Sequence, residues 1–498
     1  MGKLTVEQGS ASACNAPVAE NIIKVGANAW RSARADRIAF LIDGADYFDR
    51  LNEALRCAVK TIWIIGWDFN PDIYLRPDRP DETLGELLLS LAERNPDLEI
   101  RILVWAMGPV YSGKSLRLFS EKTWSTHPRI HLKFDSKHPL RGSHHQKFVC
   151  IDETIAFLGG IDVTARRWDD SRHLAVNPMR VTPEGDSYEP VHDLQAAVTG
   201  EAAAMIGDLA RRRWQRATGK TVEAGEKGGP IWPESLPSEL GGCDVALALT
   251  EPGFPGRKSR REAIRMTIDA MAAARRHIYI ETQYLASFGI AEILERRLAE
   301  PDGPEIVVIV TRISHGFLEK IMMGNNRDRL IRRLKRADRH NRLRVLYPVV
   351  PAEDGGEQDV IIHSKLMVID DYFLRLGSSN LNNRSEGLDT ESDIAIEAVN
   401  GNCRQAIANL RNRLIAEHVE ASIDAVEQAL ARTTSMIDTI DELNTRARGL
   451  RSLDVGKKGE ISPVWGTDFV DPKKPYWPLQ KFRAGVDTLT SRFLNIFT

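Results

Sequence analysis

Apolar runs rich in β-branched and aromatic residues recur along the chain, each bounded by turn residues, and helical patterns lie between several of them. The first series of such runs covers residues 61–67, 99–107, 129–135 and the pair 144–152 and 154–160. Short runs of this composition predict buried strands, and their alternation with helical periodicity predicts an α/β fold.

A second series follows in the same order at residues 277–285, 305–312, 342–350 and the pair 360–370 and 373–380. The corresponding runs are separated by about 206 to 218 residues, so a module of about 200 residues occurs twice. We therefore predict two similar α/β lobes, each a mixed sheet flanked by helices, that face each other as a pseudo-dimer with the active site between them. The alternative is one large sheet without internal symmetry.

Changes in composition suggest where these units begin and end. The Gly- and Pro-rich stretch at 219–242 reads as the connector between the lobes. The predicted divisions are an N-terminal extension 1–34, a first lobe 35–218, the linker 219–242, a second lobe 243–450 and a C-terminal tail 451–498.

Two further stretches have helical periodicity. Apolar residues between Ile407 and Leu430 recur mostly at three- and four-residue steps, which predicts one or more amphipathic helices. In the tail, apolar residues from Phe482 to Phe497 repeat at helical spacing beside basic residues. A helix of that kind either docks on its own protein or lies on a membrane surface.

Composition is typical of a soluble globular protein. The 498 residues carry a formal net charge of −2, with 42% hydrophobic and 27% charged residues, which excludes global disorder, collagen-like repetition and a strongly basic coat for nucleic acid. Five cysteines occur singly, so reduced thiols are expected rather than a zinc knuckle or a disulfide framework.

Targeting signals are not apparent. The N-terminus lacks the pattern of a cleaved leader, Val6 stands where myristoylation requires Ser or Thr, and no apolar run approaches the roughly 18 to 20 residues of a membrane span. A cytoplasmic or peripheral membrane location is expected, and export without a cleaved leader stays open.

The most informative pattern is a constellation that occurs once in each module. His145, Lys147, Asp152, Gly160 and Asp162 are matched, at the same spacing, by His363, Lys365, Asp370, Ser378 and Asn380. Residues two apart on a strand share a face, so each His and Lys pair projects into one space. The Gly or Ser turn after the next strand allows backbone to approach a ligand closely.

Two imidazoles across one cleft suit the cleavage of a phosphodiester. One imidazole attacks phosphorus, while the other protonates the departing alcohol and then activates the incoming one. Two lysines stabilise the charge that develops on the non-bridging oxygens. This arrangement requires no metal and no cofactor. Asp152 and Asp370 are candidates either for catalysis or for hydrogen-bond anchors at strand turns or between the lobes.

The doubled H-x-K-x4-D-x6-G-[GS]-x-[ND] pattern resembles the phospholipase D superfamily, over roughly residues 35–420. Flanking stretches at 43–55, 66–77, 278–285 and 382–396 are similar to the eukaryotic-type phospholipases D and their bacterial relatives. The phox and pleckstrin modules that many eukaryotic members carry are not evident before residue 35.

The resemblance implies a role for each motif residue. His145 is implied to be the nucleophile that forms a phosphohistidine, and His363 the acid and base. Lys147 and Lys365 are implied to bind phosphate oxygens. Further phosphate contacts are implied for Asn380, Ser378, Gly160 and Asp162.

Three other inferences follow from the resemblance. Asp162 stands where many members have Asn, and a carboxylate donates no hydrogen bond unless it is protonated, so Asp162 is expected to orient Lys147 or to lie beside the phosphate. Each imidazole is implied to have an acid on its other nitrogen, Asp193 for the first motif and Glu391 for the second. The alternative is that each acid only caps a helix or forms an ion pair on the surface. Trp67 and Trp168 are candidates for the cleft wall or for the core.

The resemblance implies a phospholipase D that hydrolyses the distal phosphodiester of a phosphatidylcholine-like lipid to phosphatidic acid, with transfer to alcohols. The alternatives are a cardiolipin-synthase-like transferase, which normally carries N-terminal membrane spans, and a metal-independent nuclease, which needs a basic groove. A non-enzymatic role is disfavoured because both motifs are intact. The expected partners are a phospholipid and a membrane surface, with no nucleic acid, for a monomer with an internal pseudo-twofold axis.

One basic run bears on the nuclease alternative. The segment from Arg327 to Arg344 is locally strongly basic. Between its two ends lie Arg329, Arg332, Arg333, Lys335, Arg336, Arg339 and Arg342. We interpret the run as a solvated helix face, with contacts to anionic lipid headgroups or between the lobes as the alternatives.

Overall fold

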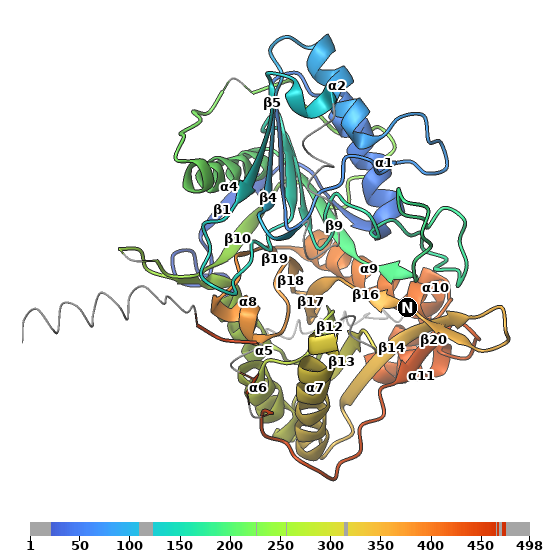
Figure 1. The fold of residues 1–498 in the computed structure, drawn as a ribbon. Helices are drawn as coiled ribbons and strands as arrows, with labels where there is room; N and C mark the ends of the chain where they lie inside the picture. The colour runs from blue at the N-terminus through green and yellow to red at the C-terminus, as the bar shows by residue number, and fades with distance from the viewer. Residues whose placement is uncertain are drawn as a thin grey trace, which may run out of the picture.

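The computed structural model describes residues 21–108, 123–225, 227–254, 256–312, 317–464, 466–467 and 471–474. Two mixed β-sheets flanked by helices form two lobes, the first in the upper half of Figure 1 and the second in the lower half. The prediction of a two-lobed α/β fold is confirmed.

The first lobe contains a seven-stranded sheet in the order β2-β9-β7-β6-β3-β4-β5. Strands β3, β4 and β5 are parallel to one another, and the other neighbours are antiparallel. The strands are β2 (Ile38–Ile42), β3 (Thr61–Gly66), β4 (Glu99–Trp105), β5 (Ile130–Asp135), β6 (Phe148–Ile151), β7 (Ile155–Gly159) and β9 (Leu194–Thr199).

The second lobe repeats this sheet strand for strand, in the order β10-β19-β18-β17-β12-β13-β14 and with the same pattern of parallel and antiparallel pairs. Its strands are β10 (Cys243–Glu251), β12 (His277–Thr282), β13 (Glu305–Val310), β14 (Leu343–Pro351), β17 (Lys365–Ile369), β18 (Phe373–Gly377) and β19 (Glu391–Glu397). Internal duplication is therefore a property of the fold, and the single asymmetric sheet is excluded.

Four short strands extend the second sheet beyond the repeat: β1 (Arg31–Ala35), β11 (Arg260–Arg261), β15 (Glu357–Asp359) and β20 (Gly449–Ser452). Strand β1 pairs with β10, so residues just before the first lobe complete an edge of the second. The connector packs on the first lobe, where Ile231 and Leu236 join its buried core.

The helices are α1 (Asp43–Arg56), α2 (Leu84–Arg94), α4 (Glu201–Thr218), α5 (Glu262–Ala273), α6 (Phe288–Ala299), α7 (Phe317–Ala337), α8 (Asn383–Gly387), α9 (Gly401–His418), α10 (Ile423–Thr433) and α11 (Met436–Leu443), with a 3-10 turn η2 at Thr123–Thr126. Helix α2 begins at a capping box in which Thr83 and Glu86 satisfy each other's backbone amides. The periodicity between Ile407 and Leu430 corresponds to α9 and α10.

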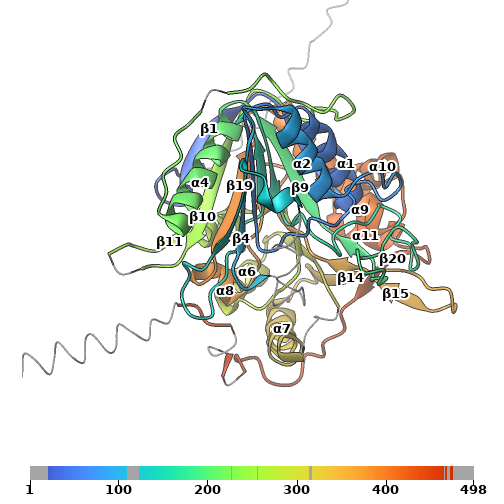
Figure 2. The same cartoon turned by 45° about the horizontal axis from the view of Figure 1, so that its top comes forward.

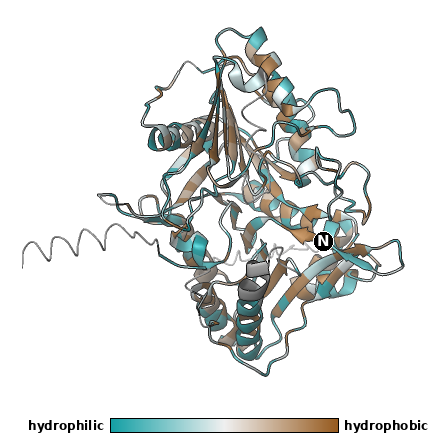
Figure 3. Cartoon of the chain, in the orientation of Figure 1, coloured by the Kyte–Doolittle hydropathy of each residue, from teal (hydrophilic) through white to brown (hydrophobic). Residues whose placement is uncertain are grey.

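One hydrophobic core runs through both lobes. It includes Phe40 and Trp214 from the first lobe and Leu247, Leu366 and Leu410 from the second. Helix α4 of the first lobe packs beside β1 of the second sheet (Figures 1 and 2), and most of the strands repeated in the two lobes are hydrophobic (Figure 3). Because burial of this apolar surface stabilises both lobes together, each lobe depends on the other.

The basic run on α7 is only in part a solvated face, as Arg336 and Arg339 are exposed while several members of the run contact the chain. Arg329, Arg332 and Arg336 donate to backbone carbonyls of the segment 456–462. Arg333 forms an ion pair with Glu295 of α6. Arg329, Arg332 and Arg336 thus attach the segment after β20 to the second lobe, a contact that the interpretation from the sequence did not include.

Among the described residues, the structure has no helix that is both long and apolar enough to cross a membrane. The expected amphipathic helix at 482–497 and Cys14 lie outside the described residues.

Candidate active site

Two parallel strand contacts between the lobes position the two motif histidines. Strand β8 (Val191–His192) of the first lobe pairs with β16 (Ile361–Ile362) of the second, and the amide of His363 donates to the carbonyl of His192 at 2.8 Å. The pseudo-symmetric contact joins His144 to Thr390, and the amide of His145 donates to the carbonyl of Thr390 at 3.0 Å. Each histidine segment therefore lies beside the strand that leads to an acid of the other lobe.

The imidazole and acid pairs are crossed between the lobes. Glu391 Oε2 lies 2.9 Å from Nδ1 of His145, and Asp193 Oδ2 lies 2.7 Å from Nδ1 of His363. The two predicted acids thus hold the two predicted imidazoles, but the expected pairing is wrong: Asp193, the acid of the first motif, holds the second-motif histidine, and Glu391 holds the first. The exchange arises because each histidine segment pairs with a strand of the other lobe. With Nδ1 occupied, Nε2 is the nitrogen left to react in each ring.

Both motif lysines are buried and held by side chains at the site. Lys147 Nζ lies 3.0 Å from Asp162 Oδ2 and donates to the carbonyl of His145 at 3.2 Å. Lys365 Nζ donates to Gln283 Oε1 at 3.4 Å and lies 3.2 Å from Nδ1 of His363. Asp162 therefore orients Lys147, one of the two roles predicted for it, whereas the contact of Lys365 is an amide oxygen, that of Gln283.

The cations of both lobes act on both imidazoles. Burial holds the pKa of His145 well below its usual value, and Lys147 and Lys365 lower it further. Burial likewise lowers the pKa of His363, followed by Lys365, Arg167, Lys147 and then the His145 ring itself. Both imidazoles therefore lie within the field of the same two lysines, one from each lobe, which favours a bound anion such as a phosphodiester.

The two acids are also shifted by burial. Burial raises the pKa of Glu391 to about 7, against hydrogen bonds from Ser378 and Ser385 that lower it. Burial raises the pKa of Asp193 to about 6, and the charge of Lys365 opposes that rise. Ser378 Oγ donates to Glu391 Oε2 at 2.6 Å, so this hydroxyl supports the acid.

Gly160 and Asn380 are both predicted to contact phosphate, but only Asn380 has a side-chain atom without a hydrogen-bond partner among the described residues. The amide of Gly160 donates to the Leu194 carbonyl at 2.9 Å, and a Cβ atom at Gly160 would lie 2.0 Å from Asp193 Oδ1. Gly160 thus makes room for the acid rather than offering its amide. The backbone amide of Asn380 donates to Ser385 Oγ at 3.1 Å, while Asn380 Oδ1 has no hydrogen-bond partner in the described chain.

Asp152 and Asp370 are anchors at strand turns. Each has a left-handed backbone, with φ of 51° and 53°. The carboxylate of Asp152 accepts the amides of residues 59–61 at 2.7 to 2.8 Å, and that of Asp370 accepts those of residues 275–277 at 2.6 to 2.8 Å. Neither contacts a catalytic imidazole or lysine within the described ranges, so the structure supports the anchoring alternative and not a catalytic role.

The sequence did not single out Arg167 or Gln283. The charge of Arg167 acts on His363, Lys365 and Asp193, and its Nε is buried without a hydrogen-bond partner among the described residues. Gln283 directly follows β12 and contacts Lys365. In the sequence, Arg167 is marked only by its position close after the first motif, and Gln283 only by its position at the end of a predicted strand.

The tryptophans occupy two environments. Trp168 is 9% exposed and packs in the core of the first lobe, which is the core alternative. Trp67 is half-buried, and its ring centre lies 5.6 Å from that of Trp105.

Comparison with known proteins gives the same division into two halves. Residues 54–227 match the family profile described as phospholipase D, and residues 267–414 match the one described as cardiolipin synthase, PLD-like domain. These matches fall on the first and second lobes.

Individual proteins match over most of the chain. Phospholipase D1 of Saccharomyces cerevisiae is 25% identical over 493 residues, covering 78% of this chain and 29% of the yeast protein. Phospholipase D alpha 4 of Arabidopsis thaliana is 24% identical over 524 residues, covering 81% of this chain and 67% of the plant protein. The chain spans about a third or less of the first three curated relatives.

A solved structure shares the fold. The phosphatidylserine synthase of Haemophilus influenzae superposes with a TM-score of 0.53 at 14% identity, covering 82% of this chain and 95% of the other. The fold and the site define a duplicated α/β protein with one two-histidine centre shared by its lobes. The chain belongs to the phospholipase D superfamily and carries two domains of that type.

Proposed function

We propose that this protein is a phospholipase D, which cleaves the distal phosphodiester of a phosphatidylcholine-like glycerophospholipid through a phosphohistidine. The observation that carries the proposal is the pair of crossed contacts, His145 with Glu391 and His363 with Asp193, with Lys147 and Lys365 acting on both imidazoles. The phospholipase D names of the relatives support the choice of substrate class.

In the first step, Nε2 of His145 attacks phosphorus, a P–N bond forms and the bond from phosphorus to the headgroup oxygen breaks. Glu391 holds the Nδ1 proton of His145 and thereby directs the lone pair of Nε2 to the substrate. His363 gives its Nε2 proton to the departing oxygen, so the headgroup leaves as a neutral alcohol.

In the second step, His363 takes a proton from water, the water oxygen attacks phosphorus and the P–N bond breaks. The products are phosphatidic acid and free His145. A primary alcohol in place of water gives a phosphatidyl alcohol by the same route. Lys147, Lys365 and Arg167 stabilise the charge on the non-bridging oxygens in both steps.

The electrostatics of the free site suit the nucleophile. Burial and the surrounding cations keep His145 neutral, which leaves its lone pair available. His363 has to carry a proton before the first step, and a bound phosphodiester anion favours this because it offsets the charges of Lys365 and Arg167.

A phosphatidyltransferase is the second candidate. Its first step is the same, and only the acceptor in the second step differs. The fold shared with a phosphatidylserine synthase and the cardiolipin synthase description of the second profile favour this candidate. A nuclease has less support, because arginines of the basic run are bound to the segment 456–462.

The test is incubation with phosphatidylcholine vesicles and a primary alcohol, with products identified by mass spectrometry and a panel of headgroups in parallel. A phospholipase D gives phosphatidic acid and phosphatidyl alcohol, and the His145→Ala protein gives neither. If product forms only when a second lipid or an amino alcohol is supplied as acceptor, the protein is a phosphatidyltransferase and not a hydrolase. Intact lipid together with DNA cleavage in the presence of a chelator would overturn the proposal.

A further inference from the structure

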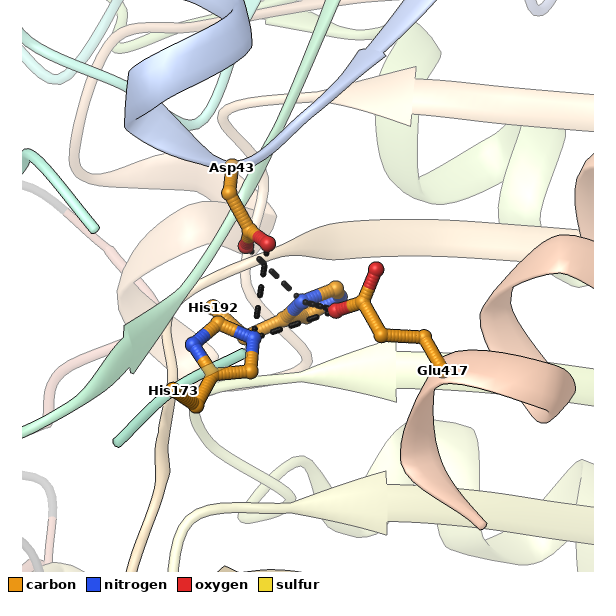
Figure 4. A group of neighbouring side chains, drawn as sticks. All are labelled: Asp43, His173, His192 and Glu417. Carbon is orange, nitrogen blue, oxygen red and sulfur yellow. Dashed lines mark hydrogen bonds and ion pairs between the residues drawn. The ribbon is translucent and has the colours of Figure 1, made fainter. Parts of the chain in front are cut away.

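A second cluster of ionisable side chains is buried between the lobes and takes no part in the proposed reaction. It consists of Asp43 at the start of α1, His173 in a loop, His192 on β8 and Glu417 on α9 (Figure 4). The side chains of Asp43 and His173 are each 1% exposed, that of His192 is 0% exposed and that of Glu417 11%. The first three belong to the first lobe and Glu417 to the second.

The donor atoms of these four side chains converge. His192 Nδ1 lies 3.0 Å from Asp43 Oδ1 and 3.1 Å from Glu417 Oε1. His173 Nε2 lies 3.1 Å from Glu417 Oε1 and 3.4 Å from Asp43 Oδ2. Two ligands of a tetrahedral zinc ion with bonds of about 2.0 to 2.1 Å are about 3.3 Å apart, which is close to these four imidazole–carboxylate separations. One donor atom from each of the four residues lies within 4.8 Å of the others, so the side chains can converge on one ion.

Hydrogen bonding leaves this cluster incomplete. Both carboxylate oxygens of Asp43 and Nδ1 of His192 have no hydrogen-bond partner in the part of the chain that the structure describes, although Asp43 Oδ1 lies 3.0 Å from that nitrogen. The atoms are close but not aligned for a hydrogen bond. An unsatisfied buried carboxylate is costly, and a cation at the centre removes that cost.

Both imidazoles are held from behind by carboxylates. His173 Nδ1 lies 2.9 Å from Asp169, which is itself paired with Arg180. His192 Nε2 lies 3.0 Å from Glu281. Metal-binding histidines almost always donate their second nitrogen in this way, which fixes the ring and its tautomer.

A neighbouring trio, His192, Glu281 and His418, does not form a rival site. Glu281 accepts hydrogen bonds from His192 and Ser364 on one oxygen and from Tyr279 and His418 on the other. Its oxygens are therefore satisfied, whereas those of Asp43 are not. Glu281 and His418 support His192 from outside the four-residue cluster.

We propose that Asp43, His173, His192 and Glu417 bind one divalent transition-metal ion, best fitted by zinc, that clamps the two lobes together. Two imidazole and two carboxylate ligands suit zinc, and a buried site closed by four protein ligands is structural rather than catalytic.

The clamp also bears on the active site. His192 immediately precedes Asp193, and the amide of Asp43 donates to the Asp193 carbonyl at 2.8 Å. A metal bound to Asp43 and His192 therefore fixes the backbone on both sides of the acid that holds His363. These four residues position the acid and do not touch the phosphodiester.

The first test is the metal content of the full chain, purified without chelator and without a nickel column. We expect about one zinc ion per chain. Removal with a strong chelator should lower the melting temperature, and added zinc should restore it. Replacement by cobalt should give the visible absorption bands of a tetrahedral site. A metal-free protein whose melting temperature does not respond to zinc, cobalt or manganese would overturn the proposal in favour of protonated imidazoles.

Near-isosteric variants locate the ion. Asp43→Asn and Glu417→Gln should each reduce the metal content roughly tenfold or more. His418→Gln is the matched control, because it changes the same buried network but not a proposed ligand, and it should keep its metal. Unchanged metal content in both ligand variants would overturn the assignment. His145→Ala should keep the metal while losing activity, so this inference and the proposed function can fail separately.

Discussion

Glu391 of the second lobe holds Nδ1 of His145 of the first lobe at 2.9 Å. The reciprocal contact joins Asp193 of the first lobe to His363 of the second at 2.7 Å. Both follow from parallel strand contacts between the lobes, one at β8 and β16 and one at His144 and Thr390. A complete imidazole and acid pair therefore exists only when the lobes are joined.

The two histidines should fail differently. His145→Ala removes the attacking atom, and we expect no release of the leaving group from any substrate. His363→Ala should lower turnover of phosphatidylcholine by roughly 10² to 10⁴ because acid and base assistance is lost. With a p-nitrophenyl phosphodiester, whose leaving group needs no proton, the His363→Ala enzyme should still give one burst of nitrophenol per site.

Quenched-flow measurement of that burst tests the assignment. The control is wild-type enzyme, which should show continued turnover after the burst. A burst in His145→Ala and none in His363→Ala would exchange the roles of the two histidines.

The crossed pairing predicts which acid supports which step. Asp193→Asn should have the same effect as His363→Ala. We expect a retained burst on the nitrophenyl substrate and slow release of the phosphoryl group from His145. Glu391→Gln should slow the burst itself, because it weakens the orientation of His145. Single-turnover rates on the same substrate measure both effects. The opposite result, with the burst lost in Asp193→Asn and kept in Glu391→Gln, would show that each acid serves the histidine of its own half.

Removal of the Ser385 hydroxyl should change the pH dependence of activity. Ser385 Oγ donates to Glu391 Oε1 at 2.7 Å and lowers the pKa of this acid, which burial raises to about 7. The ionised form that holds His145 exists above that pKa and is lost as the pH falls through it. Ser385→Ala should raise the pKa further and shift the acid limb of kcat/KM upward by about 0.5 to 1 pH unit.

Ser379→Ala is the matched control for this experiment. The Ser379 hydroxyl is buried nearby and has no hydrogen-bond partner among the described residues. Its removal should leave the pH profile in place. An acid limb that moves equally in both variants, or downward in Ser385→Ala, would contradict the assignment of Glu391.

The anchoring aspartates should affect stability rather than chemistry. Asp152→Asn and Asp370→Asn keep a side chain that tolerates the left-handed backbone, but each places an NH2 group or a weaker acceptor against three amides. We expect each to lower the free energy of unfolding by about 1 to 3 kcal/mol. Asp186→Asn, at a side chain that is 71% exposed, should change it by less than about 0.5 kcal/mol.

Denaturant unfolding measures that difference, and activity per folded molecule should stay within a few-fold of wild type. A loss of activity by orders of magnitude at unchanged stability would restore a catalytic role for these residues.

The sequence by itself determined the duplicated sheet and the two matching pairs of histidine and lysine that we propose as catalytic. His145 and Lys147 lie two residues apart directly before β6, so they stay close together whatever the rest of the chain does. The same spacing recurs at His363 and Lys365, and this repetition predicted two lobes with a single active site between them.

Tertiary structure decided the partners of these residues. The crossing of Glu391 and Asp193, the anchoring role of Asp152 and the cluster around Asp43 join segments far apart in the chain. The docking of two sheets on a common core sets those contacts, and no spacing in the sequence records which strand of one lobe will lie beside which strand of the other.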